Sequence, residues 1–395
     1  MPDAILTLNA GSSSMKFGLF EIAEEAPAKG VARGEIDGIG TAPHFVARDT
    51  QGTIIGEAHW DASQDHEALI GGLLDWAEGH LGEDRLVAAG HRVVHGGRDF
   101  TAPVRIDDAV LTALTALTPL APLHQPHSLS PVRAIMAMRP DLPQVACFDT
   151  AFHHAMPAVA VRYALPRAYE EEGVRRYGFH GLSYEFIERQ LRETAPELAQ
   201  GRVIVAHLGN GASLCAMSNG RSIDTTMGFT ALDGLMMGTR CGAIDPGILL
   251  YMLQEKGLDA HAIEDILYRK SGLLGVSGIS ADMRELAKSA DPHAREALEL
   301  FAYIIAREAA GLVASLGGLD GLVFTAGIGE HTPAVRQAVC ERLEWLGVIL
   351  DPIANETHAS RISTAESSVE VRVIPTDEEA MILRHTIETL KLGSS

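Results

Sequence analysis

The sequence predicts an α/β protein made of two copies of one strand-rich unit. Two observations support this prediction. Both halves of the 395-residue chain open with the same order of strand and turn patterns, and helical patterns alternate with strand patterns through the rest. Such alternation is typical of α/β architectures. A chain of this length also has room for two domains of ordinary size.

The first copy begins at Ile5. The apolar run 5–8 leads into the small-residue turn 9–14 (NAGSSS), and a second apolar run follows over residues 15–20. This pattern predicts a buried strand, a turn and the return strand of a hairpin, with residues 31–36 as a third strand. Backbone N–H groups and hydroxyl groups can converge on a small anion at such a turn, and Lys16 adds a positive charge.

The second copy begins at Val203. The β-rich run 203–208 meets the turn 209–213 (GNGAS), and the strand that follows turns at Asn219 and Gly220, a strong hairpin dipeptide. Residues 221–225 are the matching third strand. Small-residue turns at matched places indicate an internal duplication, which is a more specific signal than either turn alone.

Helices are predicted between and after these strands. Apolar residues recur at helical spacing over residues 66–80, and Ser130 followed by Pro131 is typical of a helix start. A last helix is expected over about residues 379–392, packing back on the first domain. The apolar strand 145–148 ends near the expected domain boundary, so residues 1–150 with 379–395 form the predicted first domain and 151–378 the second.

Composition narrows the classes of function. The net charge is −20 without a basic cluster, so nucleic acid is not an expected partner. The 4 cysteines are widely spaced and contain no C-x-x-C pair, which indicates a reducing compartment and neither zinc nor a disulfide framework. No basic segment of a signal peptide precedes Lys16, and no apolar run reaches transmembrane length. We therefore expect a soluble cytoplasmic protein with no membrane partner.

Two arginines lie beside glycines, one in each half. Arg92 lies in the segment 91–97 (HRVVHGG) and Arg240 in 237–242 (MGTRCG). Each could be a surface arginine next to a turn. Glycines also allow close backbone approach, however, and a guanidinium offers a planar fork to phosphate or carboxylate. Together the two arginines could close on one phosphoryl group from two sides, as phosphoryl transfer requires.

Three further side chains are candidates for chemistry. Asp149 follows the strand 145–148, and ligands of open α/β sheets bind at the carboxyl ends of strands. It could orient a nucleophile, hold a metal or simply cap a turn. His180 lies between Phe179 and Gly181 and is either catalytic or structural. His207 ends its strand as Asn9 ends the first one, which favours contact with phosphate or nucleotide over proton transfer.

Segments near the C-terminus add candidate anion sites. The strand 321–326 ends in the glycine turn 327–331 (GIGEH), and Thr332 then caps a helix, so this region is a candidate nucleotide cradle. Ser280 is expected to cap the helix that contains residues 282–284. Thr376 and Glu379 fit a capping box, which leaves the carboxylates at 377 and 378 free to reach a magnesium ion.

Taken together, these motifs resemble the acetokinase family over essentially the whole chain. The signatures 9–16 and 207–213 match in order and spacing, as do 91–97, 148–153, 177–181, 238–240, 327–330 and 376–379. The resemblance implies a duplicated ribonuclease H-like fold, with two lobes and a nucleotide cleft between them that closes on its ligands. It also implies a homodimer that reversibly transfers the ATP γ-phosphoryl group to acetate, giving acetyl phosphate and ADP by direct in-line transfer with Mg²⁺, or Mn²⁺ as an alternative.

The resemblance also assigns roles to residues. Asn9 and Glu378 match magnesium ligands, Arg92 binds acetate and the phosphoryl group, and Asp149 is the essential carboxylate. His180 and Arg240 match groups that stabilise the transition state. The pocket for the acyl methyl group comprises Val94, Leu123 and Phe179. The nucleotide-binding positions are Ser14, Lys16, His207, Leu208, Gly209, Asn210, Gly211, Asp282, Met283, Arg284, Gly327, Ile328, Gly329, Glu330 and His331.

Two positions depart from the family pattern. Ala231 replaces a frequent proline of the acyl pocket, and a smaller side chain there could admit propionate. His331 replaces an asparagine, which affects the expected adenosine contacts. Propionate and butyrate kinases of the same family therefore stay open as alternatives, as does a non-catalytic nucleotide-binding protein on this fold. A dinucleotide-dependent dehydrogenase is disfavoured because no G-x-G-x-x-G opens a first crossover helix.

Overall fold

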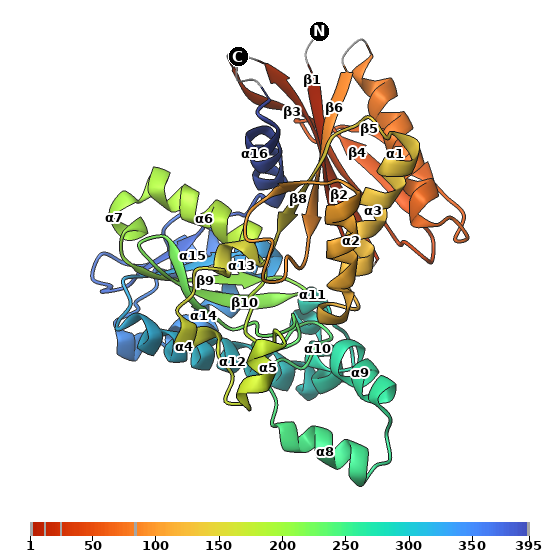
Figure 1. Cartoon of the computed structure of the whole chain (residues 1–395). Coiled ribbons are helices and arrows are strands. Elements are labelled where there is room, and N and C mark those ends of the chain that lie inside the picture. Colours follow the sequence, from red (N-terminus) through yellow and green to blue (C-terminus); the bar gives the residue numbers. More distant parts are fainter. Residues whose placement is uncertain (1–2, 12, 24–25, 83–84, 393–395) are drawn as a thin grey trace. The chain divides into compact units, whose positions relative to one another are not determined.

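The chain divides into two compact units, which we describe separately (Figure 1). The structure is a computed structural model that describes residues 3–11, 13–23, 26–82 and 85–392. Unit 1 comprises residues 1–151 and 377–395, and unit 2 comprises residues 152–376. Within the described ranges, no helix has both the length and the apolar character needed to cross a bilayer.

Unit 1 is built on an eight-stranded sheet with the order β5-β4-β3-β2-β1-β6-β8-β7. Its strands are β1 (Asp3–Ala10), β2 (Met15–Ala23), β3 (Ala26–Asp37), β4 (His44–Arg48), β5 (Ile54–His59), β6 (Arg85–Val93), β7 (Val104–Arg105) and β8 (Gln144–Phe148). Its helices are α1 (His66–Leu81), α2 (Asp108–Ala116), α3 (Gln125–Met138) and α16 (Glu378–Leu390), with the 3₁₀ turn η1 (Thr118–Leu120).

Helices cover both faces of this sheet (Figure 1). On one face, Leu69 and Leu73 of α1 and Ile135 of α3 pack against Phe17 in the main core cluster. On the other face, Leu383 of α16 packs against the apolar side chains of β1 and β2. The C-terminal helix therefore belongs to unit 1, where it packs against β1, β6 and β8 and its first residue, Glu378, bonds Asn9 near the end of β1.

Unit 2 is built on a five-stranded sheet with the order β11-β10-β9-β12-β13. Its strands are β9 (Arg202–Leu208), β10 (Ala212–Ser218), β11 (Arg221–Thr225), β12 (Gly321–Thr325) and β13 (Glu370–Val373). Its helices are α4 (Ala158–Val161), α5 (Arg167–Glu171), α6 (Gly181–Thr194), α7 (Pro196–Ala199), α8 (Pro246–Gln254), α9 (Ala260–Arg269), α10 (Gly272–Ser277), α11 (Met283–Lys288), α12 (Pro292–Leu316), α13 (Ala326–His331), α14 (Pro333–Glu341) and α15 (Pro352–Glu356). One core cluster joins Ile187 and Leu191 of α6 to Val205 of β9.

The two sheets share one topology. The order β3-β2-β1-β6-β8 in unit 1 corresponds strand by strand to β11-β10-β9-β12-β13 in unit 2. In unit 1, β1 pairs antiparallel with β2 and parallel with β6. In unit 2, β9 pairs antiparallel with β10 and parallel with β12. The predicted α/β class and the internal duplication are confirmed, and β4, β5 and β7 are additions to unit 1.

One predicted helix start is wrong. Helix α3 begins at Gln125 with Pro126 in its first turn, so Pro131 lies inside the helix instead of opening it. Leu129 and Val132 are fully buried on either side of that proline. Burial of this apolar face stabilises the helix enough for it to continue past Pro131, a residue type that local propensity would place at a helix start.

Two predicted caps are also wrong. Asp377, not Thr376, caps α16 by accepting from the amide of Ala380, and Asp282, not Ser280, caps α11 by accepting from the amide of Arg284. A carboxylate is an acceptor at least as good as a hydroxyl and also interacts favourably with the helix dipole. The glycines of 327–331 belong to the short helix α13, which starts at Ala326.

Candidate active site

In unit 1, four polar side chains meet at the carboxyl ends of β1, β6 and β8. Nε of Arg92 donates to Oδ1 of Asp149 at 2.9 Å, and Nη2 donates to Oδ2 at 2.5 Å. Nη1 of Arg92 donates to Oδ1 of Asn9 at 3.1 Å, and Nδ2 of Asn9 donates to Oε2 of Glu378 at 2.8 Å. The result is a continuous chain of four predicted site residues, at the edge of the sheet where α/β proteins bind their ligands.

The charges of this network are only partly balanced. Asp149 is 1% exposed, and burial opposes the charge on Arg92, but Asp149 and Glu378 outweigh that effect and raise the pKa of Arg92. Burial also raises the pKa of Glu378 to about 7, with repulsion from Asp149 and Glu379 adding to the increase and Arg92 and Asn9 opposing it. An ionised Glu378 therefore lacks full compensation, and a bound cation would supply it.

The first small-residue turn lies next to this network. The carbonyl of Ser14 accepts from the amide of Gly11 at 2.8 Å, which closes the turn between β1 and β2. Lys16 is exposed and pairs with Asn9 across the two strands. The predicted phosphate-contacting residues Ser14 and Lys16 are therefore held beside Asn9, while Ser12 of the same turn lies outside the described residues.

A buried glutamine fixes the segment that follows Arg92. The side chain of Gln125 accepts from the amide of His95 at 3.1 Å and donates to its carbonyl at 3.0 Å. Val94, 3% exposed, directly precedes His95, and Leu123 lies two residues before Gln125. These bonds tie the turn after β6 to the start of α3, the two segments that contain Val94 and Leu123.

In unit 2, His180 adopts a left-handed backbone conformation (φ 58°, ψ 25°) at the start of α6. Its Nδ1 makes a 2.8 Å hydrogen bond with Oγ of Ser213, which also bonds the hydroxyl of Tyr184. Its ring stacks on that of His207 with centroids 4.1 Å apart. Left-handed conformations of non-glycine residues are strained and cluster at functional sites, so this held orientation favours a functional His180.

The adjacent Phe179 is positioned by a second histidine. Nε2 of the fully buried His153 donates to the carbonyl of Phe179 at 3.0 Å, and its Nδ1 bonds Oγ of Ser222 at 2.8 Å. Burial lowers the pKa of His153 to about 4, so this imidazole is neutral at physiological pH. His153 therefore supports the backbone immediately before His180.

Arg240 approaches His180 within unit 2. Its Nη1 donates to the carbonyl of Ala231 at 3.0 Å. A β-carbon at position 211 would lie 3.3 Å from Nε2 of His180 and 3.8 Å from Nη1 of Arg240. The glycine at 211 thus leaves open the space that both cationic or donor groups face, as a phosphate site requires.

The predicted nucleotide-binding segments of unit 2 lie together. The amide of Gly238 donates to the carbonyl of Asn210 at 3.1 Å, and a β-carbon at 238 would lie 3.5 Å from the carbonyl oxygen of Ala281. A β-carbon at Gly209 would lie 3.8 Å from that of Ala326. Backbone from 207–211, 281–284 and 326–331 therefore meets around one glycine-lined region. Ala326 is also left-handed (φ 64°).

Side chains of the last two segments are held in different ways. Asp282 pairs with Arg284, and this hydrogen bond lowers the pKa of Asp282 to about 2. Met283 is buried beneath them. Oε1 of Glu330 accepts from the amide of Thr376 at 3.1 Å, whereas the His331 side chain is 75% exposed.

A buried arginine that the sequence analysis did not single out supports α13. Arg336 is fully buried, and its Nη1 donates to the carbonyls of Gly329 at 2.9 Å and Glu330 at 2.8 Å. Its Nε donates to Oδ1 of Asn355 at 2.7 Å. Nothing in the local sequence distinguishes Arg336 from a surface arginine on an amphipathic helix, because only the fold brings the backbone carbonyls and the Asn355 side chain to it.

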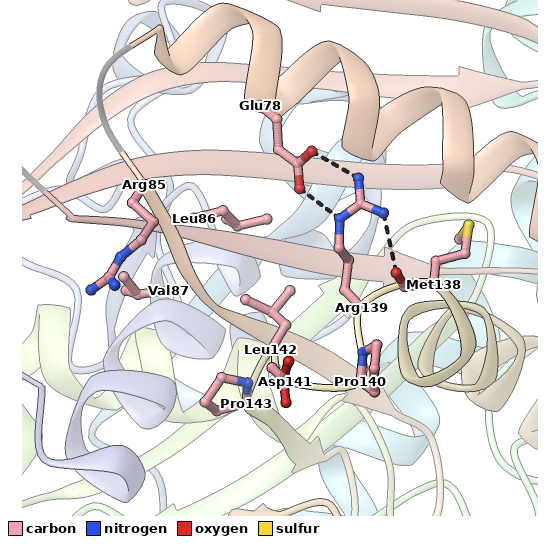
Figure 2. Close-up of a pocket in the computed structure, with 10 residues that line it drawn as sticks. All are labelled: Glu78, Arg85, Leu86, Val87, Met138, Arg139, Pro140, Asp141, Leu142 and Pro143. Atoms are coloured by element: carbon pink, nitrogen blue, oxygen red, sulfur yellow. Dashed lines mark hydrogen bonds and ion pairs between the residues drawn. The ribbon is translucent and has the colours of Figure 1, made fainter.

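Within unit 1, a hollow lies away from Arg92, Asp149 and Glu378 (Figure 2). It has a volume of about 550 Å³ and is bordered by the first residues of β6, by Met138 and Arg139 and by the segment 140–143 that leads into β8. Arg139 crosses it to form a forked ion pair with Glu78 at 2.9 and 2.8 Å. It is at the amino ends of the parallel strands, and none of the predicted site residues line it.

Comparison with known proteins agrees with the predicted resemblance. The acetokinase family pattern matches residues 4–384. An acetate kinase of Rhodopseudomonas palustris is 55% identical over 389 residues, which cover 98% of each chain. The structure of Porphyromonas gingivalis acetate kinase is 37% identical with a TM-score of 0.87, covering 98% of this chain and 100% of that one. A propionate kinase from Francisella tularensis is also 37% identical, with a TM-score of 0.89 and coverages of 98% and 99%.

Proposed function

The chain belongs to the acetokinase family, and on this premise we propose that it is an acetate kinase, which transfers the γ-phosphoryl group of ATP to acetate and, in reverse, the phosphoryl group of acetyl phosphate to ADP. The observation that supports this reaction best is the Arg92 network. A guanidinium fixed by a buried carboxylate at the carboxyl ends of three strands is a fork suited to carboxylate and phosphate.

Direct in-line transfer requires that two anions be neutralised before they meet. In our proposal, Arg92 binds acetate and the phosphoryl group, and His180 and Arg240 stabilise charge on the group in transfer. Acetate is already ionised at neutral pH, because an ordinary carboxyl has a pKa of about 4–5. Asp149 is therefore assigned to holding Arg92 in position and not to general base catalysis. Val94, Leu123 and Phe179 are assigned to the acyl methyl group.

The oxygen donors of unit 1 fit a divalent cation. Asn9 and Glu378 offer amide and carboxylate oxygens, which Mg²⁺ prefers, and burial raises the pKa of Glu378 although Arg92 partly compensates its charge. When bound there, Mg²⁺ would neutralise phosphate charge, and Mn²⁺ accepts the same donors. We propose Asn9 and Glu378 as the residues that hold the metal.

The remaining assignments concern nucleotide and assembly. We propose that residues 207–211, 282–284 and 327–331 bind the nucleotide and that Ser14 and Lys16 contact its phosphates. Two observations support the assignment: glycines at 209, 211, 327 and 329 leave the backbone of two of these segments open to a ligand, and Asn210, Arg284 and Gly327 are exposed. We also propose a cytoplasmic homodimer without nucleic-acid or membrane partners, as the family resemblance and the charge of −20 suggest.

Asp149→Asn tests the positioning role. We expect kcat to fall about 10²-fold or more while KM for acetate changes less than tenfold. The amide of asparagine holds the Arg92 guanidinium less firmly than the carboxylate does, but the positive charge of Arg92 is still present to bind acetate. Steady-state kinetics measure both constants. Asp141→Asn, at an exposed carboxylate of the same unit, is the matched control. A large KM effect with near-normal kcat would contradict the role.

Ser213→Ala tests the support of His180. Loss of the hydroxyl that bonds Nδ1 frees the imidazole to rotate, so we expect kcat to fall about tenfold with a shifted pH profile. Ser315→Ala removes a hydroxyl bonded to Asp224 on an exposed face and serves as control. Wild-type kcat and pH profile in Ser213→Ala would show that His180 needs no such support.

Ala231→Pro tests acyl specificity. Because one methylene is worth about 1–3 kcal/mol of discrimination, we expect the kcat/KM for propionate relative to acetate to fall about tenfold in the variant. The carbonyl that Arg240 uses is retained by proline. Competing turnover of both acids measures the ratio, and an unchanged ratio would remove Ala231 from the acyl pocket.

The function itself is tested by trapping the acyl phosphate as its hydroxamate, from ATP and Mg²⁺ with acetate, propionate or butyrate in parallel. We expect the highest kcat/KM on acetate. Preference for propionate would favour the alternative that the Francisella tularensis structure represents. No product from any acid, together with measurable ATP binding, would favour a non-catalytic nucleotide-binding protein.

A further inference from the structure

Two histidines and a glutamate share one face of the outer hairpin of unit 1. β4 and β5 are neighbouring strands of unit 1 (Figure 1). They pair antiparallel, and the register places His44 opposite His59 and Val46 opposite Glu57. Residues two apart along a strand point to the same side. The opposite side is the core face, because Phe45 and Ala47 are 2% and 0% exposed. His44, Glu57 and His59 therefore project together away from the core.

Their donor atoms are close enough to converge. The imidazole rings of His44 and His59 stack with centroids 4.2 Å apart, and Nε2 of His44 lies 2.9 Å from Oε1 of Glu57. One donor atom from each residue lies within 4.8 Å of the other two. Two ligands of a tetrahedral zinc ion, each about 2.1 Å from the metal, lie about 3.4 Å apart. The two rings are stacked with 3° between their planes, so binding requires them to turn out of the stack until one nitrogen of each faces the ion. Neither side chain is buried, which leaves room for this rotation.

We propose that His44, Glu57 and His59 form a binding site for a transition-metal ion of the zinc class, with water completing the coordination. Two imidazoles and one carboxylate are a donor set that zinc accepts and that Mg²⁺ disfavours. The ligands come from adjacent strands in fixed register, so little backbone ordering is needed on binding. The His44 and Glu57 side chains are 31% and 49% exposed, which gives the ion access from solvent.

A neighbouring carboxylate adds to this site. Asp37 of β3 pairs in register with His44, and it is exposed while the adjacent Ile36 is fully buried. Its side chain therefore lies on the same face, in one row with His44 and His59. A carboxylate next to a ligating imidazole favours cation binding and can fix the ring orientation. The cysteine spacing predicts no zinc, and that prediction rests on cysteine as the ligand. The site proposed here contains no cysteine.

The site is distinct from the proposed magnesium position. Asn9 and Glu378 offer only oxygen donors, and neither is among the three ligands. The metal would bridge β4 and β5 at the outer edge of the sheet, so we expect it to stabilise the hairpin and leave the phosphoryl-transfer chemistry unchanged.

Zinc titration of the full-length, tag-free protein tests the proposal. The protein is stripped with chelator and titrated by calorimetry in millimolar Mg²⁺, which occupies oxygen sites. We expect one zinc ion bound per chain and binding weakened about tenfold or more in His44→Gln, His59→Gln and Glu57→Gln. His261→Gln, at an exposed histidine of α9, should bind zinc as the wild type does. Substitution by Co²⁺ should give visible absorption bands that the His44→Gln and His59→Gln variants lose.

Two outcomes would overturn the proposal. One is an absence of zinc binding to the wild type, and the other is equal zinc binding in the wild type and the His44→Gln and His59→Gln variants. Melting temperatures measured without zinc establish that each variant is folded. A zinc-dependent rise of the melting temperature in the wild type and in His261→Gln, absent in the ligand variants, would support the site without any enzymatic readout.

Discussion

Arg240→Ala is expected to lower kcat about 10³-fold. Arg240 is placed in unit 2 by a hydrogen bond to the carbonyl of Ala231, and its Nη1 faces the same glycine at 211 that Nε2 of His180 faces. An arginine directed at a phosphoryl group in transfer is worth about 10³–10⁵ in rate. The net charge of −20 makes local cations the source of positive potential at this site.

The pattern of kinetic constants distinguishes this role from substrate binding. We expect KM for ATP and acetate to change less than tenfold, because the charge on the group in transfer develops only in the transition state. Added guanidinium should restore part of the activity of Arg240→Ala. The Arg240→Lys variant keeps the positive charge but lacks the planar fork, so we expect its kcat to stay well below that of the wild type. Arg295→Ala, at an exposed position of α12, is the control. A kcat within tenfold of wild type would remove Arg240 from the chemistry.

Local patterns were sufficient to predict the repeated hairpins. In β1–β2 and β9–β10, apolar strands meet short turns of small residues, and both signals lie within one stretch of chain. The start of α3 was wrong because burial of Leu129 and Val132 decides it, and burial is a tertiary effect. The caps of α11 and α16 were wrong because two acceptors lie within two residues of each other, and spacing alone does not choose between them.

The site residues also divide into those that local sequence patterns predict and those that they do not. Asp149 could be singled out because it follows a predicted strand, and Arg92 because it lies just before two glycines. The hydrogen bond between Asn9 and Glu378 joins residues 369 positions apart, so only the family resemblance connected them beforehand. Ser213 and Arg336 act through a histidine and through backbone carbonyls, and such supporting contacts follow from packing. Sequence thus indicates charged groups beside glycines or strand ends more readily than the groups that orient them.

Glu378→Gln is expected to inactivate the enzyme and stabilise its metal-free fold. The pKa of Glu378 is raised from 4.5 to about 7 in the folded state, first by burial. Between these values the folded protein keeps a proton that the unfolded chain has released, so the stability contributed by the neutral carboxyl is lost as pH rises through this window. At pH 8 the ionised side chain costs about 1–3 kcal/mol, which glutamine does not incur.

Thermal melts in chelator measure this directly. We expect Glu378→Gln to melt about 2–6 °C above wild type at pH 8 and at nearly the same temperature at pH 4.5. Excess Mg²⁺ should raise the wild-type melting temperature more than that of the variant, since a cation compensates the carboxylate. Glu366→Gln, the same substitution at an exposed position, should neither raise the melting temperature at pH 8 nor reduce the stabilisation by Mg²⁺.

Activity gives the complementary result, a fall in kcat of about 10²-fold or more at saturating Mg²⁺. A variant that is stabilised but inactive is the expected signature of a side chain retained for a cation at a cost in stability. A Glu378→Gln protein that is no more stable at pH 8 would show that Arg92 and Asn9 already compensate the charge. Full activity in the same variant would place the metal on other oxygens of the network, with Asp149 the next carboxylate to substitute.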